Sequence, residues 1–142
     1  MGHYTTRQTL HKLLGETQDE RAADTTSAIL LTQLSEGLNT VDLTDRDICI
    51  AYEPVWAIGT GLAATPEMVQ EVHQFIRQEL IRLYNEEIAN RVRIVYGGSV
   101  NKTNATELLK QKDIDGLLVG GASLDPGHFL TICELVSKQA MA

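Results

Sequence analysis

The sequence predicts an α/β fold built from parallel βα units. From about residue 18 onward, helical and strand-like periodicities alternate, and Gly, Pro or Asp marks each change of period. The strand-like runs are apolar on both faces. Strands of this kind, separated by helices, are typical of a parallel sheet that is covered by helices.

The first segments of the chain are the least regular. Residues 9–16, TLHKLLGE, have the composition of a poor strand that ends at Gly15, but His11 and Lys12 interrupt its apolar pattern. A strand and a loop therefore both remain open for this segment. Residues 19–38 carry apolar side chains at helical spacing and a glycine near the end, which predicts one helix.

The middle of the chain predicts a strand followed by a long helix. Residues 47–52, DICIAY, form a short apolar run and predict a buried strand. Thr65 and Pro66 have the residue types of an N-cap and a first helical position. The helix that they open is amphipathic, because apolar residues recur at steps of three and four: Val69, Val72, Ile76, Leu80 and Leu83.

The last part of the chain predicts two more βα units. Residues 91–96, RVRIVY, predict a strand, and residues 103–110 predict a short helix. Residues 116–124, GLLVGGASL, predict another strand that runs into paired glycines. Asp125 and Pro126 then open a final helix.

Composition limits the classes of protein that remain. The chain has 142 residues, 43% of them hydrophobic and 22% charged, which indicates one globular domain. Its net charge of −7 argues against nucleic acid or an anionic membrane as a partner. No apolar run approaches the roughly 18 residues that span a bilayer, and the first residues lack the features of a signal peptide, so a cytoplasmic location is expected.

Cysteine and histidine positions give no indication of a metal site. Cys49 lies in a strand-like run and Cys133 in a helical pattern, and both are expected to be reduced core residues. None of the four histidines pairs with a Cys or Asp at ligand spacing. A metal site is therefore not expected, and an anionic ligand would have to be bound by local dipoles.

Candidate functional residues follow three of the predicted strands. Glu53 follows the first of them, a pair of glycines at 97–98 follows the second, and Gly120 and Gly121 follow the third. In a parallel βα array these points lie at the same edge of the sheet, where such folds bind ligands. Each feature alone also has a structural interpretation, because glycines form turns and acidic residues cap helices.

The two glycine pairs together favour a phosphate site. Peptide N–H groups without a neighbouring Cβ can approach a phosphate closely, and a helix that begins just beyond adds a positive dipole. Ser99 adds a hydroxyl donor. This is the dipole-based anion site that a chain with net negative charge requires.

The segment after Glu53 has the features of a lid. Pro54 fixes the backbone, Val55 and Trp56 supply apolar bulk, and Gly59, with a second glycine two residues later, lets the tip fold over a ligand. A carboxylate from which water is excluded is an effective general base toward a carbon acid. A structural loop with Trp56 as a core aromatic is the alternative.

Four motifs together resemble a known family. AYEPVWAIGTG at 51–61, YGGSV at 96–100, GLLVGGASL at 116–124 and GETQDER at 15–21 resemble, in this order and spacing, the carboxyl-terminal half of triosephosphate isomerase. The resemblance implies that residues 15–142 are the carboxyl-terminal half of a TIM barrel, with residues 1–14 unassigned. The resemblance itself extends to about residue 138.

The resemblance also implies roles for individual residues. Glu53 matches the family's catalytic base, which moves a proton between two carbons of a triose phosphate. The implied reaction interconverts dihydroxyacetone phosphate and glyceraldehyde 3-phosphate in glycolysis and gluconeogenesis, without metal or organic cofactor, in proteins that are usually homodimers. The remaining matches are the loop hinge, Pro54, Val55 and Trp56, and the phosphate-binding residues, Gly59, Ser99, Gly120 and Gly121.

The sequence also departs from the family pattern. A complete barrel needs eight βα units and about 250 residues, and the family's asparagine, lysine and electrophilic histidine lie in the half that has no counterpart here. Gly2, His3 and Arg7 echo the family's GHSERR element around that histidine, either by coincidence or as a trace of it. We expect little activity from the chain alone, and either association with a second copy or a complementary half barrel, or poor stability.

Two other functions remain open from the sequence. One is a non-catalytic phosphate-binding or assembly module derived from such a barrel, in which Glu53 is a relic. The other is an isomerase of a different sugar phosphate, because a phosphate site recognises the phosphate group of a substrate and does not identify the sugar attached to it.

Overall fold

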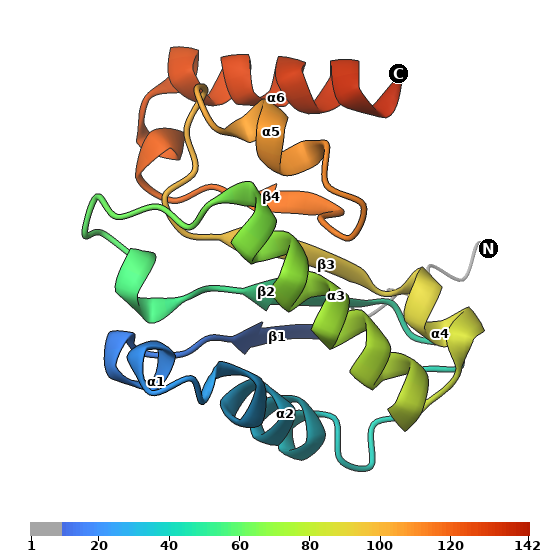
Figure 1. The fold of residues 1–142 in the computed structure, drawn as a ribbon. Coiled ribbons are helices and arrows are strands. Elements are labelled where there is room, and N and C mark those ends of the chain that lie inside the picture. The colour runs from blue at the N-terminus through green and yellow to red at the C-terminus, as the bar shows by residue number, and fades with distance from the viewer. Residues whose placement is uncertain (1–9) are drawn as a thin grey trace, which may run out of the picture.

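The computed structural model describes residues 10–142, which form one four-stranded parallel sheet with helices (Figure 1). The strands follow one another across the sheet in sequence order: β1 (Leu10–Leu14), β2 (Ile48–Tyr52), β3 (Arg93–Gly97) and β4 (Gly116–Leu118). The predicted α/β class with parallel βα units is confirmed, and the arrangement is that of a partial TIM barrel whose sheet is not closed. The segment that the sequence left open is a strand, β1. Gly2, His3 and Arg7 lie outside the described residues.

The strand register brings the carboxyl ends of the strands to one edge. Leu14 of β1 pairs with Tyr52 of β2, and Tyr52 pairs with Tyr96 of β3. Tyr96 in turn pairs with Leu117 of β4. The residues that follow each strand therefore emerge at the same edge, as the sequence predicts.

The helix predicted over 19–38 is wrong in one respect, because the structure has two helices there. Helix α1 (Gln18–Ala22) begins with a capping box in which Thr17 and Glu20 bond each other's backbone N–H groups. Asp24 then takes a left-handed conformation, with φ of 57°, which interrupts the helix. Helix α2 (Thr26–Gly37) follows and buries Leu30 and Leu34 against the core.

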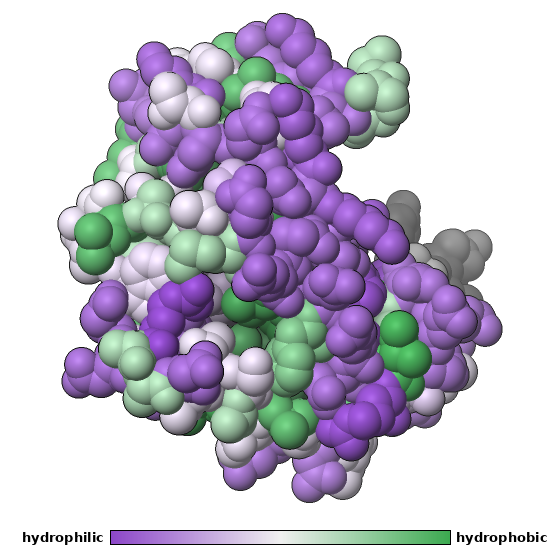
Figure 2. All heavy atoms as spheres, viewed as in Figure 1, coloured by the Kyte–Doolittle hydropathy of each residue, from purple (hydrophilic) through white to green (hydrophobic). Residues whose placement is uncertain are grey.

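Helix α3 (Pro66–Leu83) begins at the predicted proline. The Thr65 hydroxyl accepts a hydrogen bond from the Met68 N–H at 3.2 Å and so caps the helix. The apolar face is buried as the periodicity predicts, except that Leu83 at the end is exposed. The surface over α3 in Figure 2 is largely hydrophilic, which agrees with the exposure of Glu71 and Gln74 on its outer face.

The elements after α3 differ from the predicted ranges. Helix α4 (Glu86–Arg91), capped by the Asn85 side chain, occupies the residues just before β3, so this strand begins at residue 93 rather than 91. Helix α5 (Ala105–Leu109) is shorter than predicted.

The predicted strand at 116–124 is too long. Strand β4 ends at Leu118, and residues 121–124 form a 3-10 helix, η2 (Gly121–Leu124). Both the N–H and the hydroxyl of Ser123 donate to the Gly120 carbonyl, at 2.9 and 2.6 Å, which bends the chain away from the sheet. Helix α6 (Pro126–Ala140) then begins with the predicted Asp125 cap.

The hydrophobic core lies on one face of the sheet. Helices α2 and α3 pack against each other and against this face (Figure 1). Alternate strand residues point into the core, and the fully buried ones include Ile50, Tyr52, Ile94 and Tyr96. The intervening residues of the same strands point to the opposite face, which in a closed barrel would be the interior.

This opposite face and the β4 end of the sheet leave apolar side chains exposed. Leu13 of β1 is 57% exposed and Leu118 of β4 is 42% exposed. Helix α6 has 15 residues, but only Ile132 is buried, whereas Phe129 and Leu130 are exposed. Strands β1 and β4 each have one neighbour among the described strands, so the predicted free edges are present.

The two cysteines are both free thiols, as expected. Their predicted burial is wrong for one of them, because Cys133 lies exposed on α6, while Cys49 is half-buried on β2. In the part of the chain that the structure covers, no helix is both long and apolar enough to cross a membrane.

Candidate active site

Glu53 directly follows β2 and is fixed through its backbone. Its N–H donates to the Leu14 carbonyl at 2.7 Å, which continues the ladder between β1 and β2 by one residue. A Cβ at Gly15 would lie 1.9 Å from the Glu53 carbonyl oxygen. The chain therefore requires glycine at position 15 for the two strand ends to approach each other here.

The Glu53 side chain lies against the end of β3. A Cβ at Gly97 would stand 2.7 Å from Cγ and 2.8 Å from Oε1 of Glu53, so the carboxyl group occupies the space that glycine leaves open. Gly98 and Ser99 follow immediately along the chain. The structure thus brings the half-buried carboxyl group of Glu53 to the strand end where the predicted phosphate residues begin.

Three of the predicted phosphate residues line one groove. Gly59, Ser99 and Gly121 surround a groove of about 430 Å³, together with Ala57, Gly61, Gly98, Val100, Asn101, Ala122 and His128. Glu53 and Gly120 are not among the lining residues. Gly120 directly precedes the lining residue Gly121, and the Glu53 side chain contacts Gly97, which directly precedes the lining residue Gly98. The residues come from the loops after β2, β3 and β4, as a site at this edge requires.

The predicted lid begins in a short 3-10 helix, η1 (Val55–Ala57), which follows Pro54. The next two glycines, Gly59 and Gly61, have φ of 67° and 76°, in the left-handed region that favours glycine. Side chains near the tip, Ile58 and Leu62, are exposed. The loop tip therefore reaches the groove in a backbone conformation that depends on its glycines.

Trp56, at the predicted hinge, is tied to a residue that sequence analysis missed. Its Nε1 donates to Oε1 of Glu16 at 3.1 Å, and the same oxygen accepts from the Tyr52 hydroxyl at 2.9 Å and from Arg21 at 3.1 Å. Glu16 is fully buried. The Arg21 guanidinium lies 5.4 Å from the centre of the Trp56 ring.

These contacts explain the electrostatics around Glu16. Burial, together with the neighbouring Glu16 carboxylate, raises the pKa of Tyr52 far above its ordinary value, so this hydroxyl stays a donor. The sequence carries a signal for Glu16, since it is an acidic residue two positions beyond the end of β1. The ambiguity of the first strand concealed its place near a strand end.

Two asparagines that sequence analysis also missed shape the loop after β3. The side chain of Asn104 donates to the Ser99 carbonyl at 2.6 Å and accepts from the Asn101 N–H at 2.9 Å. The side chain of Asn101 accepts in turn from the N–H groups of Thr103 and Asn104. The sequence NKTN directly after GGSV carries the signal, since Asn side chains often close such turns.

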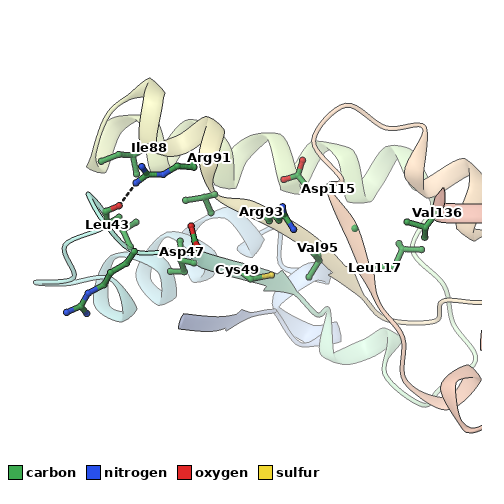
Figure 3. Close-up of a pocket in the computed structure, with 14 residues that line it drawn as sticks. Leu43, Asp47, Cys49, Ile88, Arg91, Arg93, Val95, Asp115, Leu117 and Val136 are labelled. Carbon is green, nitrogen blue, oxygen red and sulfur yellow. Dashed lines mark hydrogen bonds between the residues drawn. The ribbon is translucent and has the colours of Figure 1, made fainter. Parts of the chain in front are cut away.

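A cavity with a larger volume than this groove lies elsewhere. It has a volume of about 620 Å³ and is lined by residues from the amino ends of β2, β3 and β4, including Asp47, Cys49, Arg93 and Asp115 (Figure 3). Burial raises the pKa of the Cys49 thiol there. Neither Glu53 nor any predicted phosphate residue borders this cavity. In residues 10–142 no group of three or more His, Cys, Asp or Glu side chains is arranged to hold a metal ion.

Comparison with known proteins places the chain in a family. The family model for triosephosphate isomerase matches residues 12–136. The triosephosphate isomerase of Entamoeba histolytica is 49% identical over 127 residues, which is 89% of this chain and 49% of the relative. Those of Acidithiobacillus ferrooxidans and Chlorobaculum tepidum are each 52% identical over 85% of this chain, and over 48% and 49% of their own lengths.

The match therefore covers most of this chain but only part of each relative. The chain spans about half the length of the curated relatives that it matches. The matched residues include the strand ends that carry Glu53, Ser99 and Gly121. On the extent and identity of these matches, the chain belongs to the triosephosphate isomerase family.

Proposed function

We propose that this chain carries the general base, the lid and the phosphate groove of a triose-phosphate isomerase. The single observation that supports this most is the position of Glu53, whose carboxyl group lies against Gly97 beside the groove that Gly59, Ser99 and Gly121 line. The proposed reaction is the one that the resemblance implies: interconversion of dihydroxyacetone phosphate and glyceraldehyde 3-phosphate.

In this proposal the groove holds the phosphate dianion and Glu53 moves the proton. Backbone N–H groups at Gly59, Ser99, Gly120 and Gly121 bind the phosphate without a formal positive charge, which suits a chain of net charge −7. Glu53 removes a proton from the carbon beside the carbonyl and returns it to the neighbouring carbon through an enediolate. Pro54, Val55 and Trp56 act as the hinge of a lid that excludes water. No metal or cofactor takes part.

The enediolate needs donors that the resemblance assigns to the other half of the barrel. Loss of one preorganised donor of this kind costs about 2.7 to 4 kcal/mol of transition-state stabilisation. We therefore propose that efficient turnover requires association with a complementary half barrel, and that this chain alone has little activity. Residues 15–142, with β1, form the carboxyl-terminal half of that assembly.

The open sheet face and its edges are the proposed contact surface for that association. Leu13 and Leu118 expose apolar surface on the face opposite the core, and Phe129 and Leu130 expose more of it on α6. A second copy could occupy the same surface, because parallel edges can pair with each other. We place the assembled enzyme in the cytoplasm, in glycolysis and gluconeogenesis, as a homodimer of complete barrels.

A reconstitution assay tests the catalytic proposal. Isomerase activity is measured for the chain alone and after refolding with the amino-terminal half of the Entamoeba histolytica relative. Activity should rise at least a hundredfold on mixing, and it should fall with Glu53→Asp and disappear with Glu53→Gln. A 1:1 complex that forms without activity would overturn the proposal.

A non-catalytic phosphate-binding or assembly module is the second candidate, and the uncovered sheet favours it. In that case Glu53 takes no part in binding. Titration with a phosphorylated enediolate analogue separates the two functions, since a module should bind it no more tightly than inorganic phosphate. An isomerase should bind the analogue more tightly, and Glu53→Gln should remove the difference.

A further inference from the structure

Three segments line the groove, and the two that follow β3 and β4 are each held together by internal hydrogen bonds. In the loop at 98–104, the side chains of Asn101 and Asn104 bond the backbone on both sides of the turn. In the segment before α6, the N–H and the hydroxyl of Ser123 each donate a hydrogen bond to the Gly120 carbonyl. Each segment is therefore held in its own shape. The distance between the two, and so the width of the groove, depends on the pairing of β3 with β4 and on any direct contact between the segments.

His128 makes that contact. Its Nε2 atom accepts a hydrogen bond from the backbone N–H of Lys102 at 3.0 Å. Among the hydrogen bonds of residues 10–142, it is the one that joins the loop at 98–104 directly to the segment from Gly120 to the first turn of α6. His128 also lines the groove itself, beside Ser99 and Gly121.

The backbone of His128 is fixed in turn by the cap of α6. Oδ1 of Asp125 accepts from the His128 N–H at 2.9 Å, which ties the residue to the start of a 15-residue helix. The imidazole therefore extends from a rigid element to the loop that carries Ser99. Helix α5, which carries the Glu107–Lys110 pair, packs against α6.

The donor at Lys102 determines the tautomer of the ring. A backbone N–H can only donate, so Nε2 of His128 carries no proton and the ring proton is on Nδ1. Another side chain can replace His128 in this bond if it places a hydrogen-bond acceptor at the position of Nε2. Glutamine offers one at its terminal amide oxygen, whereas alanine offers none.

We propose that His128 is a positioning residue for phosphate binding: through Nε2 and the Lys102 N–H it sets the width of the groove between Ser99 and Gly121. This inference rests on the proposed phosphate groove. It adds a residue outside the motifs from which that groove was predicted. It also assigns the residue an acceptor function that a substitution can remove and restore.

The test compares three variants with the unmodified chain, using inorganic phosphate as the probe. Backbone amide shifts of Gly98, Ser99 and Gly121 are followed by NMR during titration at pH 8, and the free energy of unfolding is measured in urea alongside. His128→Ala should weaken phosphate binding about fivefold, the amount expected from loss of one hydrogen bond. His128→Gln should restore binding to within about twofold. Thr131→Ala, which removes a hydroxyl bonded only to the Gly127 carbonyl, should leave phosphate affinity unchanged.

The outcomes separate this inference from the proposed function. If phosphate shifts none of these amides in the unmodified chain, both the groove and the inference are wrong. If the unmodified chain binds phosphate and His128→Ala binds it equally well, only the inference is wrong, even if that variant is less stable. Equal weakening in His128→Ala and His128→Gln would also overturn it, because the acceptor would then not be the feature that matters.

Discussion

The indole Nε1 of Trp56 lies 3.1 Å from Oε1 of Glu16 and donates to it, so the start of the lid is bonded to the end of the neighbouring strand. The bond crosses from the loop after β2 to the loop after β1. It leaves the two glycines at the lid tip free of such ties. This bond holds Trp56, at the proposed hinge, against the neighbouring loop.

Trp56→Phe tests this tether, because it removes the N–H donor and keeps an aromatic ring. Hydrogen bonds to a charged group contribute about 1.5 to 3 kcal/mol, so the free energy of unfolding should fall by about that amount in urea denaturation. Limited proteolysis within residues 55–62 should become faster. A variant as stable and as resistant as the unmodified chain would show that the bond contributes nothing.

Gly97→Ala should displace the Glu53 carboxyl group. The added carbon would stand 2.7 Å from Cγ of Glu53, a distance that the side chain can relieve only by moving. Isomerase activity of the reconstituted complex should drop by at least tenfold, with little change in phosphate affinity. Gly116→Ala is the matched control, since its added carbon meets only a Val95 methyl group at 3.2 Å. Equal activity in the two variants would contradict the assigned position of Glu53.

Arg77 should be a major contributor to stability at the amino ends of the strands. Its guanidinium bonds Asp113 at 3.3 Å, Asp115 at 2.7 Å and the carbonyls of Ala89 and Val92 at 2.8 and 2.7 Å, while its side chain is 11% exposed. Breaking a buried pair costs about 3 to 5 kcal/mol, so Arg77→Leu should lower the free energy of unfolding by that order in urea.

Arg82→Leu serves as the control for Arg77. Arg82 pairs with Glu79 one turn away, and its side chain is 60% exposed. Exposed pairs of this kind contribute about 0 to 1 kcal/mol. Similar losses in the two variants would mean that burial of the Arg77 network has no energetic effect.

Stability should rise with pH between about pH 4 and pH 6.5 because of His73. Burial lowers the pKa of this histidine from 6.5 to about 4 in the folded chain. The unfolded chain therefore binds more protons than the folded chain in this window, so the free energy of unfolding falls as pH decreases. The shift corresponds to about 3 kcal/mol.

His73→Asn should flatten this pH dependence. In the unmodified chain Nδ1 lies 2.9 Å from the Asp113 carbonyl oxygen, and the amide nitrogen of asparagine, which is also attached to Cγ, can make this contact without titrating. Urea denaturation at half-unit pH intervals measures the slope. A slope that survives the substitution would assign the pH dependence to other groups.

Leu13→Asp should weaken association at the open sheet face. Leu13 is 57% exposed on β1, and a carboxylate there would have to be desolvated in any closed sheet. Sedimentation velocity at micromolar concentration should show a shift toward monomer. Leu62→Asp is a matched control, because Leu62 is 56% exposed but lies in the lid. Association that is unaffected by Leu13→Asp would place the contact elsewhere.

The sequence predicts those elements whose local signals agree with their packing. Helix α3 has both an N-cap and an apolar face, and its start at Pro66 is predicted to the residue. The edge that holds Glu53 follows from parallel strands and needs no knowledge of side-chain contacts. These features depend on periodicity and capping, which are properties of short segments.

The missed features depend on contacts between distant segments. Glu16 is significant because Tyr52 and Trp56, 36 and 40 residues further along the chain, donate to it. The break between α1 and α2 depends on a left-handed Asp24, and aspartate also occurs within helices, so its residue type alone gives no signal. The end of β4 depends on the two hydrogen bonds that Ser123 donates to the Gly120 carbonyl. The apolar composition of this segment favours a strand instead.

The four strands all run in the same direction, so two copies continue the parallel sheet only where the β1 edge of one meets the β4 edge of the other. Copies that add edge to edge would therefore join head to tail, either as a ring of two or as a filament without end. Sheet curvature favours the ring, since a barrel closes at eight strands. Charge favours it too, because repulsion between copies that each carry −7 accumulates as a filament grows.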